Sequence, residues 1–147
     1  MVTTATDVDA LAQACAERIW SEDRASHALG MSLDHVGAGV ATVCMVVRRD
    51  MVNGYGTCHG GVISMLADTA FAFACNSRGT ITVAAGFDIS FLEPAHVDDV
   101  LVAEAHEVFL RMRSGIYDVT VRCGDTTIAD FRGRSRSLGR AILRNQR

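Results

Sequence analysis

The stretch from residue 58 to residue 77 constrains the fold more than any other part of this 147-residue chain. Its sequence, CHGGVISMLADTAFAFACNS, is rich in Ala, Leu, Met and Phe and predicts a helix that is apolar on nearly every side. Two glycines near its start and the segment NSRG at its end mark its boundaries. Because a helix that is apolar all round belongs inside a protein, we expect a buried central helix that the remaining elements surround.

The residues after this helix change to a period of two, which is typical of β-strands. Apolar and polar side chains alternate over residues 81–91, and this predicts a long strand with one face in the core. Glu93 and Pro94 end the strand, because proline has no N–H to donate to a sheet. Gly124 and Asp125 predict the last hairpin turn. Three further strands follow the same pattern, at residues 100–109, 115–123 and 126–137.

The residues before the central helix predict one helix and one hairpin. Thr6, with Asp9 three residues later, resembles an acidic capping box and starts an amphipathic helix that ends at about Trp20. Polar residues 21–26 form a connection. The segment 37–39, Gly-Ala-Gly, is expected to turn the chain between two strands. These two extended runs cover residues 29–36 and 40–48.

Together the elements predict a single α+β domain over residues 1–147, in which an antiparallel sheet of five to six strands wraps around one long helix. One helix cannot cover both faces of such a sheet, and the sheet keeps exposed edges. Pairing with a second copy of the chain would protect those edges. We therefore expect a homo-oligomer, at least a dimer.

The composition excludes several classes of protein. No apolar run approaches the roughly 18 residues that a membrane span needs, and the net charge of −3 argues against a nucleic-acid partner. All 14 basic residues are arginine, which excludes Schiff-base chemistry on lysine. The 5 cysteines are scattered without metal-ligand spacing, so we expect no metal site. Reduced thiols and the lack of a visible signal segment predict a cytoplasmic protein.

The segment 53–68, NGYGTCHGGVISMLAD, carries the candidate chemistry. Gly60 and Gly61 open the helix, where backbone N–H groups have no intrahelical partner and the helix dipole is positive. Glycine lets a ligand oxygen approach such an amide closely, and an oxyanion would be stabilised there. The alternative interpretation is a loop that needs glycine only for its turns.

Asp68 is the only carboxylate of the apolar helix. Burying it is costly unless it has a partner or a catalytic task; the alternative is a structural carboxylate that caps a turn or pairs with arginine. Gly60 and Asp68 are eight residues apart, about 12 Å along a helix. One reacting carbonyl cannot touch both in the same chain. If both act, each site is composite, and a dimer has two of them.

Each of the other polar candidate residues is compatible with two interpretations. His59 either positions a substrate and shapes the loop, or bonds to backbone near the helix start. Asn53 can orient a carbonyl, but Asn-Gly is also a common turn pair, and by itself it reads as a turn residue. Arg132, Arg134 and Arg136 share one face of a strand, where they either guard a sheet edge or bind a phosphate-rich ligand. We favour ligand binding, through Arg132 and Arg134 above all.

The run HGGVISMLADTAFAFACNS, preceded by Asn53-Gly54 and followed by FLEP and FRGRS, closely resembles the hotdog-fold thioesterases of the phenylacetate-degradation (PaaI) type. The resemblance covers nearly the whole chain. It implies a hotdog fold and the hydrolysis of an acyl-CoA thioester, such as (hydroxy)phenylacetyl-CoA or a similar aryl-acyl-CoA, to the free acid and CoA. It implies no cofactor and no metal.

The resemblance also implies roles for individual residues. Asp68 matches the catalytic carboxylate, acting as general base or as nucleophile, and Gly60 matches the amide that the opposite subunit contributes as oxyanion donor. Asn53 and His59 match positions that hold the carbonyl and the loop. The CoA phosphates are assigned to the last strand, at Arg132 and Arg134, with Gly61 as a further CoA contact. The assembly implied is a dimer of dimers.

Two other functions compete with hydrolysis. The first is a non-catalytic hotdog protein that binds acyl-CoA, and the second is a hydratase that acts on enoyl-CoA. A hydratase needs a histidine to work with its carboxylate, and neither His96 nor His106 offers a convincing partner for Asp68.

Overall fold

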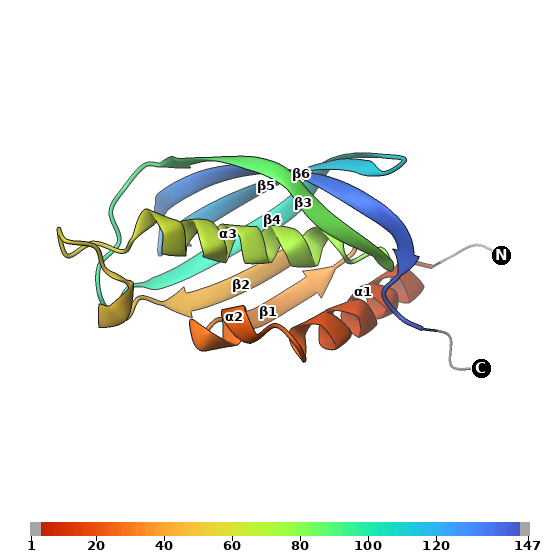
Figure 1. Cartoon of the computed structure of the whole chain (residues 1–147), viewed down its shortest axis with the longest axis horizontal. Coiled ribbons are helices and arrows are strands. Elements are labelled where there is room, and N and C mark those ends of the chain that lie inside the picture. Colours follow the sequence, from red (N-terminus) through yellow and green to blue (C-terminus); the bar gives the residue numbers. More distant parts are fainter. Residues whose placement is uncertain (1–3, 145–147) are drawn as a thin grey trace.

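The computed structural model describes residues 4–144 and contains one antiparallel sheet of six strands. In chain order the strands are β1 (Ser32–Gly37), β2 (Val40–Val46), β3 (Thr80–Phe91), β4 (Val100–Arg111), β5 (Ser114–Cys123) and β6 (Thr126–Ala141). Their order in the sheet is β1-β2-β4-β5-β6-β3, so β1 and β3 are the edges. The sheet curls around helix α3 (Gly60–Cys75), as Figure 1 shows. This confirms the α+β architecture that the sequence predicts.

Helix α3 supplies the centre of the core. The buried side chains of Leu66, Ala70 and Phe71 face the inner side of the sheet. Burying a leucine or phenylalanine side chain contributes about 1.5–3 kcal/mol. The helix is two residues shorter at each end than the predicted 58–77, because His59 caps its start and Asn76 its end. The expectation of burial on every side was wrong. One stripe of α3 remains partly or fully exposed: Gly61, Ser64, Met65, Asp68 and Ala72.

The N-terminal elements differ in detail from the prediction. Helix α1 (Ala5–Trp20) begins two residues earlier than predicted, because the capping box is formed by Thr4 and Asp7 rather than by Thr6 and Asp9. The predicted connection 21–26 contains most of a short helix, α2 (Arg24–Ala28). The 3-10 helix η1 (Arg49–Met51) follows β2. Among residues 4–144, no helix has both the length and the apolar character needed to cross a bilayer.

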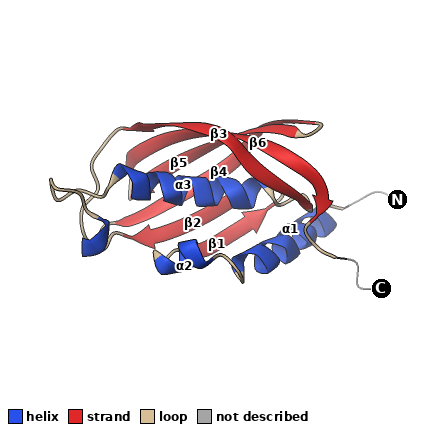
Figure 2. Cartoon of the chain, in the orientation of Figure 1, coloured by secondary structure: helices blue, strands red, loops and turns tan. Residues whose placement is uncertain are grey.

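The strands also depart from the predicted limits. The first hairpin is confirmed, but both of its strands are shorter than expected, and β6 runs past residue 137. The larger correction concerns β3. Its apolar side chains do not form a core face within one chain: Val83, Phe87 and Phe91 are 44%, 39% and 51% exposed. As Figure 2 shows, β3 lies at the rim of the sheet, beside α3.

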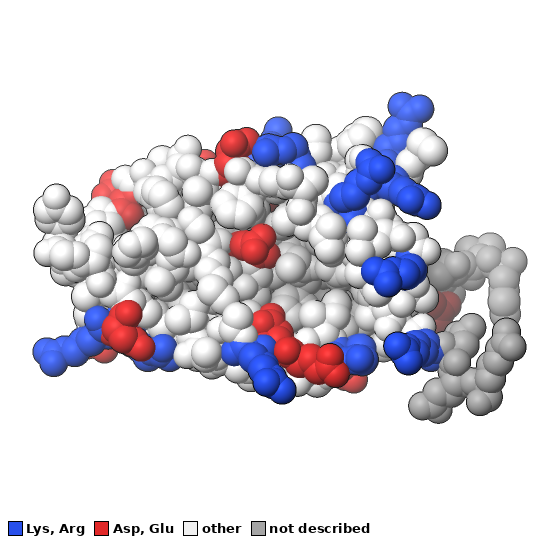
Figure 3. All heavy atoms as spheres, in the orientation of Figure 1, with Lys and Arg blue, Asp and Glu red and all other residues white. Residues whose placement is uncertain are grey.

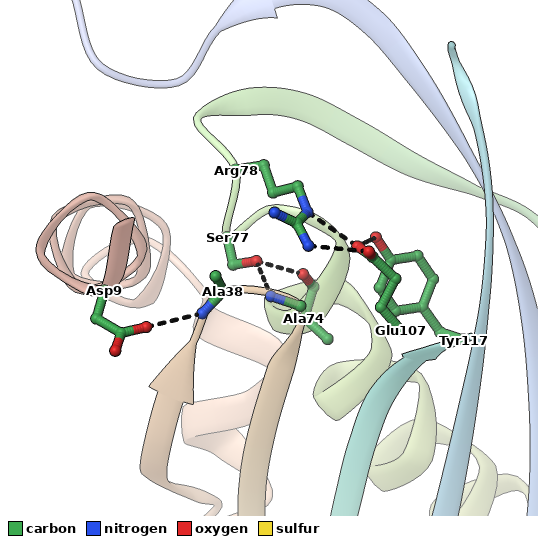
Figure 4. A network of polar contacts seen from close by, with 8 residues as sticks. Asp9, Ala38, Ala74, Ser77, Arg78, Glu107 and Tyr117 are labelled. Carbon is green, nitrogen blue, oxygen red and sulfur yellow. Dashed lines mark hydrogen bonds and ion pairs between the residues drawn. The ribbon is translucent and has the colours of Figure 1, made fainter. Parts of the chain in front are cut away.

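Polar contacts fasten the C-terminal end of α3 to the N-terminal half of the chain (Figure 4). The Ser77 hydroxyl donates to the carbonyl of Ala74 at 2.7 Å and accepts from the N–H of Gly39 in the first hairpin, also at 2.7 Å. In the same hairpin the Ala38 N–H donates to Asp9, at 3.2 Å. Asp9 therefore connects α1 to the hairpin, and it has no part in capping α1.

A second group of contacts links the end of α3 to strands β4 and β5. The Arg78 guanidinium donates twice to the Glu107 carboxylate, at 2.9 Å each, and the buried Tyr117 hydroxyl donates to the same carboxylate at 2.9 Å. Burial alone would raise the pKa of Glu107. The bonds from Arg78 and Tyr117 outweigh that effect and hold the pKa below its usual value.

Replacing Tyr117 with phenylalanine tests this arrangement. Tyr117→Phe removes a hydrogen bond to a charged acceptor inside the core, so we expect the free energy of unfolding in urea to fall by about 1.5–3 kcal/mol at neutral pH. Because the native pKa of Glu107 is lowered, this contribution is present above the unfolded pKa and is lost as the pH falls through the native pKa. Tyr55→Phe is the control, since Tyr55 is 94% exposed. Equal stability of the two variants would contradict the assignment.

Candidate active site

The start of α3 presents an unused backbone donor. His59 is the N-cap residue, and its Nδ1 accepts from the N–H of Gly61 at 2.9 Å. The carbonyl of His59 accepts from Val62 and Ile63. Within residues 4–144 the N–H of Gly60 donates to no acceptor, which leaves it free for a ligand. His59 thus makes the contact with the backbone near the helix start that one of its two interpretations from the sequence predicts.

Gly60 lies beneath an aromatic side chain from the end of β3. A Cβ at Gly60 would come within 3.0 Å of the Phe91 ring, so only glycine leaves the amide and the ring undisturbed. Both residues line a surface cleft of about 390 Å³, together with Asn53, Ile63 and Pro94. Sequence reasoning missed Phe91. The alternation along 81–91 places it on the apolar face of a strand, but not against the start of the helix.

Asn53 shapes the loop that leads into α3. Its Oδ1 accepts from the N–H groups of Tyr55 and Thr57, at 2.9 and 3.2 Å, and its Nδ2 donates to the Thr57 hydroxyl at 3.1 Å. This is the turn role that the Asn-Gly pair indicates. Because Asn53 also lines the cleft beside Gly60, the same side chain holds the loop and borders the free amide.

Asp68 lies on the partly exposed stripe of α3. Within the described part of the chain its carboxylate has no hydrogen-bond or ion-pair partner. Burial among apolar neighbours raises its pKa. A structural carboxylate that caps a turn or pairs with arginine needs a partner, and residues 4–144 supply none for Asp68. Asp68 and Gly60 are on the same straight helix, about 12 Å apart along its axis, and one chain does not bring them together.

The two arginines assigned to CoA lie on the other side of the sheet. Along β6 the buried Gly133 packs against Phe71 of α3, while Arg132 and Arg134 point to the outer face. Arg132 is paired with Asp118 at 2.6 Å and Arg134 with Asp88 at 2.9 Å. They share one face, as the spacing predicts, but that face is turned away from α3 and from Asp68.

The face of the molecule along α3 carries few charges. Figure 3 shows Arg side chains mostly at its margins, with an uncharged middle interrupted by a small acidic patch. The exposed apolar residues of β3 continue this surface. In the described ranges no group of three or more His, Cys, Asp or Glu side chains is arranged to hold a metal ion.

Comparison with known proteins identifies the family to which this chain belongs. The family model of the thioesterase superfamily matches residues 55–129, which include α3 with Asp68 and the cleft residues other than Asn53. The chain is 40% identical over 128 residues to the acyl-coenzyme A thioesterase PaaI of Escherichia coli (strain K12), and the match covers 86% of this chain and 91% of that protein. The chain therefore belongs to the thioesterase superfamily.

Solved structures of similar proteins show where the chain belongs within the superfamily. The PaaI protein from the phenylacetic acid degradation operon of E. coli matches with a TM-score of 0.89 and 37% identity, over 91% of this chain and 98% of that one. A variant of the phenylacetic acid degradation protein PaaI from Thermus thermophilus matches with a TM-score of 0.77 and 36% identity, over 79% of this chain and 100% of that one. Within the superfamily, the chain is a hotdog-fold thioesterase of the PaaI type. The resemblance drawn from the sequence is confirmed.

Proposed function

We propose that this protein hydrolyses acyl-CoA thioesters, with an aryl-acyl-CoA such as phenylacetyl-CoA or its hydroxylated form as substrate. The observation that carries the proposal is an unpartnered, half-buried carboxylate, Asp68, on the same apolar helix as a free amide, the Gly60 N–H. The name of the E. coli relative, an acyl-coenzyme A thioesterase, supports the substrate class.

The catalytic unit in this proposal is a dimer. The partly exposed stripe of α3 and the apolar residues of β3 form a surface on a single chain that is largely apolar apart from Asp68, and a second copy would cover it. Two antiparallel α3 helices across a two-fold axis bring Gly60 of one chain to Asp68 of the other. Residues 1–147 then act as one domain in a homodimer, and two dimers form the tetramer. The 5 free cysteines suit a cytoplasmic enzyme.

The chemistry follows from these two groups. The Gly60 N–H donates to the thioester carbonyl oxygen and stabilises the negative charge that develops there. Asp68 of the other chain either takes a proton from the attacking water or attacks the carbonyl carbon itself. On the first route the water oxygen bonds to the carbonyl carbon, the carbon–sulfur bond breaks, and the proton that Asp68 took from water passes to the departing CoA thiolate. On the second route the carbon–sulfur bond breaks to leave an acyl–Asp68 anhydride and the CoA thiolate, and a water molecule then hydrolyses the anhydride, which releases the acid and supplies the proton of the thiol. Single-turnover hydrolysis in isotopically labelled water separates the two routes, because only direct attack puts label into the Asp68 carboxylate.

His59 and Asn53 support the Gly60 amide in this mechanism. His59 fixes the first turn of α3 by accepting from Gly61, and Asn53 closes the preceding loop. Their side chains keep the N–H of Gly60 directed into the cleft that Asn53 lines. Gly61, which has no side chain, leaves room for the pantetheine arm of CoA near the same turn.

A panel of acyl-CoA thioesters tests the activity. With a colour reagent for free thiols, we expect thiol release from aryl-acetyl-CoA to be the fastest in the panel. A lack of thiol release from every thioester would mean a binding protein. Loss of the double-bond absorbance of crotonyl-CoA would mean a hydratase. The geometry gives the hydratase no support, since His106 lies on the outer face of the sheet, in register with Asp118.

Arg132 and Arg134 are proposed to hold the CoA phosphates. Their partners Asp118 and Asp88 are 33% and 81% exposed at the side chain, so a phosphate can compete for the guanidinium groups. The pantetheine arm would then pass β3 to connect the outer face with Asp68.

The double substitution Arg132→Ala/Arg134→Ala tests this assignment. We expect the KM for acyl-CoA to rise about tenfold, as the loss of a charge-assisted hydrogen bond predicts, with little change in kcat. The KM for the same acyl group on a short thiol without a nucleotide should not change. Arg122→Ala, an exposed arginine on β5, is the control. An unchanged KM for acyl-CoA would remove both arginines from the site.

A further inference from the structure

The aromatic ring of Phe91 lies over Gly60 and has no role in the hydrolysis described so far. Phe91 is the last residue of β3 and is 51% exposed. A Cβ at Gly60 would meet the ring carbon Cζ at 3.0 Å, Cε2 at 3.3 Å and Cε1 at 3.5 Å. These distances are similar, whereas an edge contact at Cζ would leave both Cε atoms clearly farther away. The flat face of the ring therefore covers Gly60.

Backbone hydrogen bonds hold the ring in this place. The N–H of Leu92, directly after Phe91, donates to the carbonyl of Ile128 on β6 at 2.8 Å. The N–H of Cys58, just before α3, donates to the carbonyl of Ala95 at 2.7 Å. The second bond ties the start of α3 to the segment that follows β3. The ring is thus positioned over the helix start before any substrate arrives.

The ring covers a donor that has no partner. Among residues 4–144 the N–H of Gly60 donates to no acceptor, and this N–H is bonded directly to the residue that the ring covers. Phenylalanine has no polar atom that could accept from an amide, so its ring can only keep water away. The cleft of about 390 Å³, lined by Asn53 and Ile63, leaves another side of Gly60 open.

Excluding water from this amide would favour the reaction more than the binding of substrate. A hydrogen bond is stronger where water is excluded, because the local dielectric is lower. The thioester oxygen carries more negative charge in the transition state than in the bound substrate, so the gain is larger in the transition state. An apolar cover over the Gly60 N–H therefore acts on kcat more than on KM.

Phe87 provides a comparison on the same face of β3. It lies four residues earlier and is 39% exposed. Its ring packs on that of Phe131, with ring centres 4.7 Å apart, and it does not line the cleft beside Gly60. Both rings belong to the apolar surface that a second copy would cover, but of the two it is Phe91 that lies over Gly60.

We propose, building on hydrolysis through Gly60 and Asp68, that Phe91 is a positioning residue for this reaction. Its ring excludes water from one side of the Gly60 N–H and leaves the cleft side for the thioester oxygen. The amide then meets the developing negative charge without competition from water on the covered side.

Substitutions of Phe91 test this role through kcat and KM. Phe91→Ala should lower kcat for phenylacetyl-CoA about tenfold, less than the roughly 10²-fold loss of a whole oxyanion donor, with little change in KM. Phe91→Leu keeps an apolar cover and should recover most of the lost rate. Phe87→Ala, the matched control on the same face of β3, should keep kcat close to that of the wild type. Thermal unfolding and size-exclusion chromatography show that each variant is folded and keeps its oligomeric state.

Amide proton exchange measures the cover itself, without substrate. By NMR, the exchange of the Gly60 N–H with water should be severalfold faster in Phe91→Ala than in the wild type and unchanged in Phe87→Ala. Unchanged exchange in Phe91→Ala, or a raised KM at constant kcat, would overturn the inference. Failure of the proposed function is distinguishable, because the wild type would then release no thiol from any thioester, and the positioning role would fall with it.

Discussion

Asp68→Asn should lower kcat for aryl-acyl-CoA hydrolysis about 10³-fold, in the range that general acid–base groups contribute. Asparagine keeps the shape of the side chain but can neither accept the proton of water nor form an acyl intermediate. Because burial raises the pKa of Asp68, its charged form is disfavoured in the folded protein. The variant should therefore be at least as stable as the wild type in urea.

Binding measurements separate chemistry from recognition in this variant. The affinity for CoA should stay close to that of the wild type, since the role proposed for Asp68 is at the carbonyl and not at the phosphates. Asp125→Asn, in the exposed last hairpin turn, is the matched control and should keep full turnover. Wild-type turnover in Asp68→Asn would falsify the assignment of the catalytic carboxylate.

Gly60→Ala should lower kcat about 10²-fold, comparable to the loss of one oxyanion donor. The added methyl group would meet the Phe91 ring at about 3.0 Å, so the ring, which lines the same cleft, must shift from its place over the Gly60 amide. Gly54→Ala is the control in the same loop. A Cβ at Gly54 has nothing within 4 Å, and full activity is expected there.

Combining the two inactive chains tests whether the site is shared between subunits. When Asp68→Asn and Gly60→Ala chains are co-expressed, each mixed dimer contains one site with an intact Gly60 and an intact Asp68. Random pairing makes half of the dimers mixed, with one of two sites restored, and about a quarter of wild-type activity should return. Activity no higher than that of the two separate variants would contradict a site built from two chains.

Much of the fold was accessible from the sequence because its signals are local. The apolar run around Phe71 predicts the core helix, and the period-two segments predict the strands. The wrong cap on α1 arose because Thr4 and Thr6 are both followed, three residues later, by an aspartate. The sequence does not distinguish the two pairs, and the structure shows that Thr4 and Asp7 form the capping box. Helix α2 was missed because a single turn capped by Asp23 leaves no periodic pattern.

The residues of the candidate site could be predicted where a single residue differs in chemistry from its neighbours in the sequence. Asp68 stands out as one charge in an apolar helix, and Gly60 stands out in a glycine-rich helix start. The alternation along β3 could not show that Phe91 stays exposed, because a pattern does not reveal what covers it.

The position of β3 also bears on how the protein folds. Among residues 4–144, strand β3 pairs only with β6, so residues 80–91 stay unpaired until the ribosome has made residues 129–141. Contacts between such distant residues form slowly. Until β6 arrives, Phe87 and Phe91 belong to an unpaired apolar strand, and Phe91 cannot be fixed over Gly60. The free amide thus acquires its surroundings only after β6 has been made, and a nascent chain that lacks β6 is both inactive and prone to aggregate.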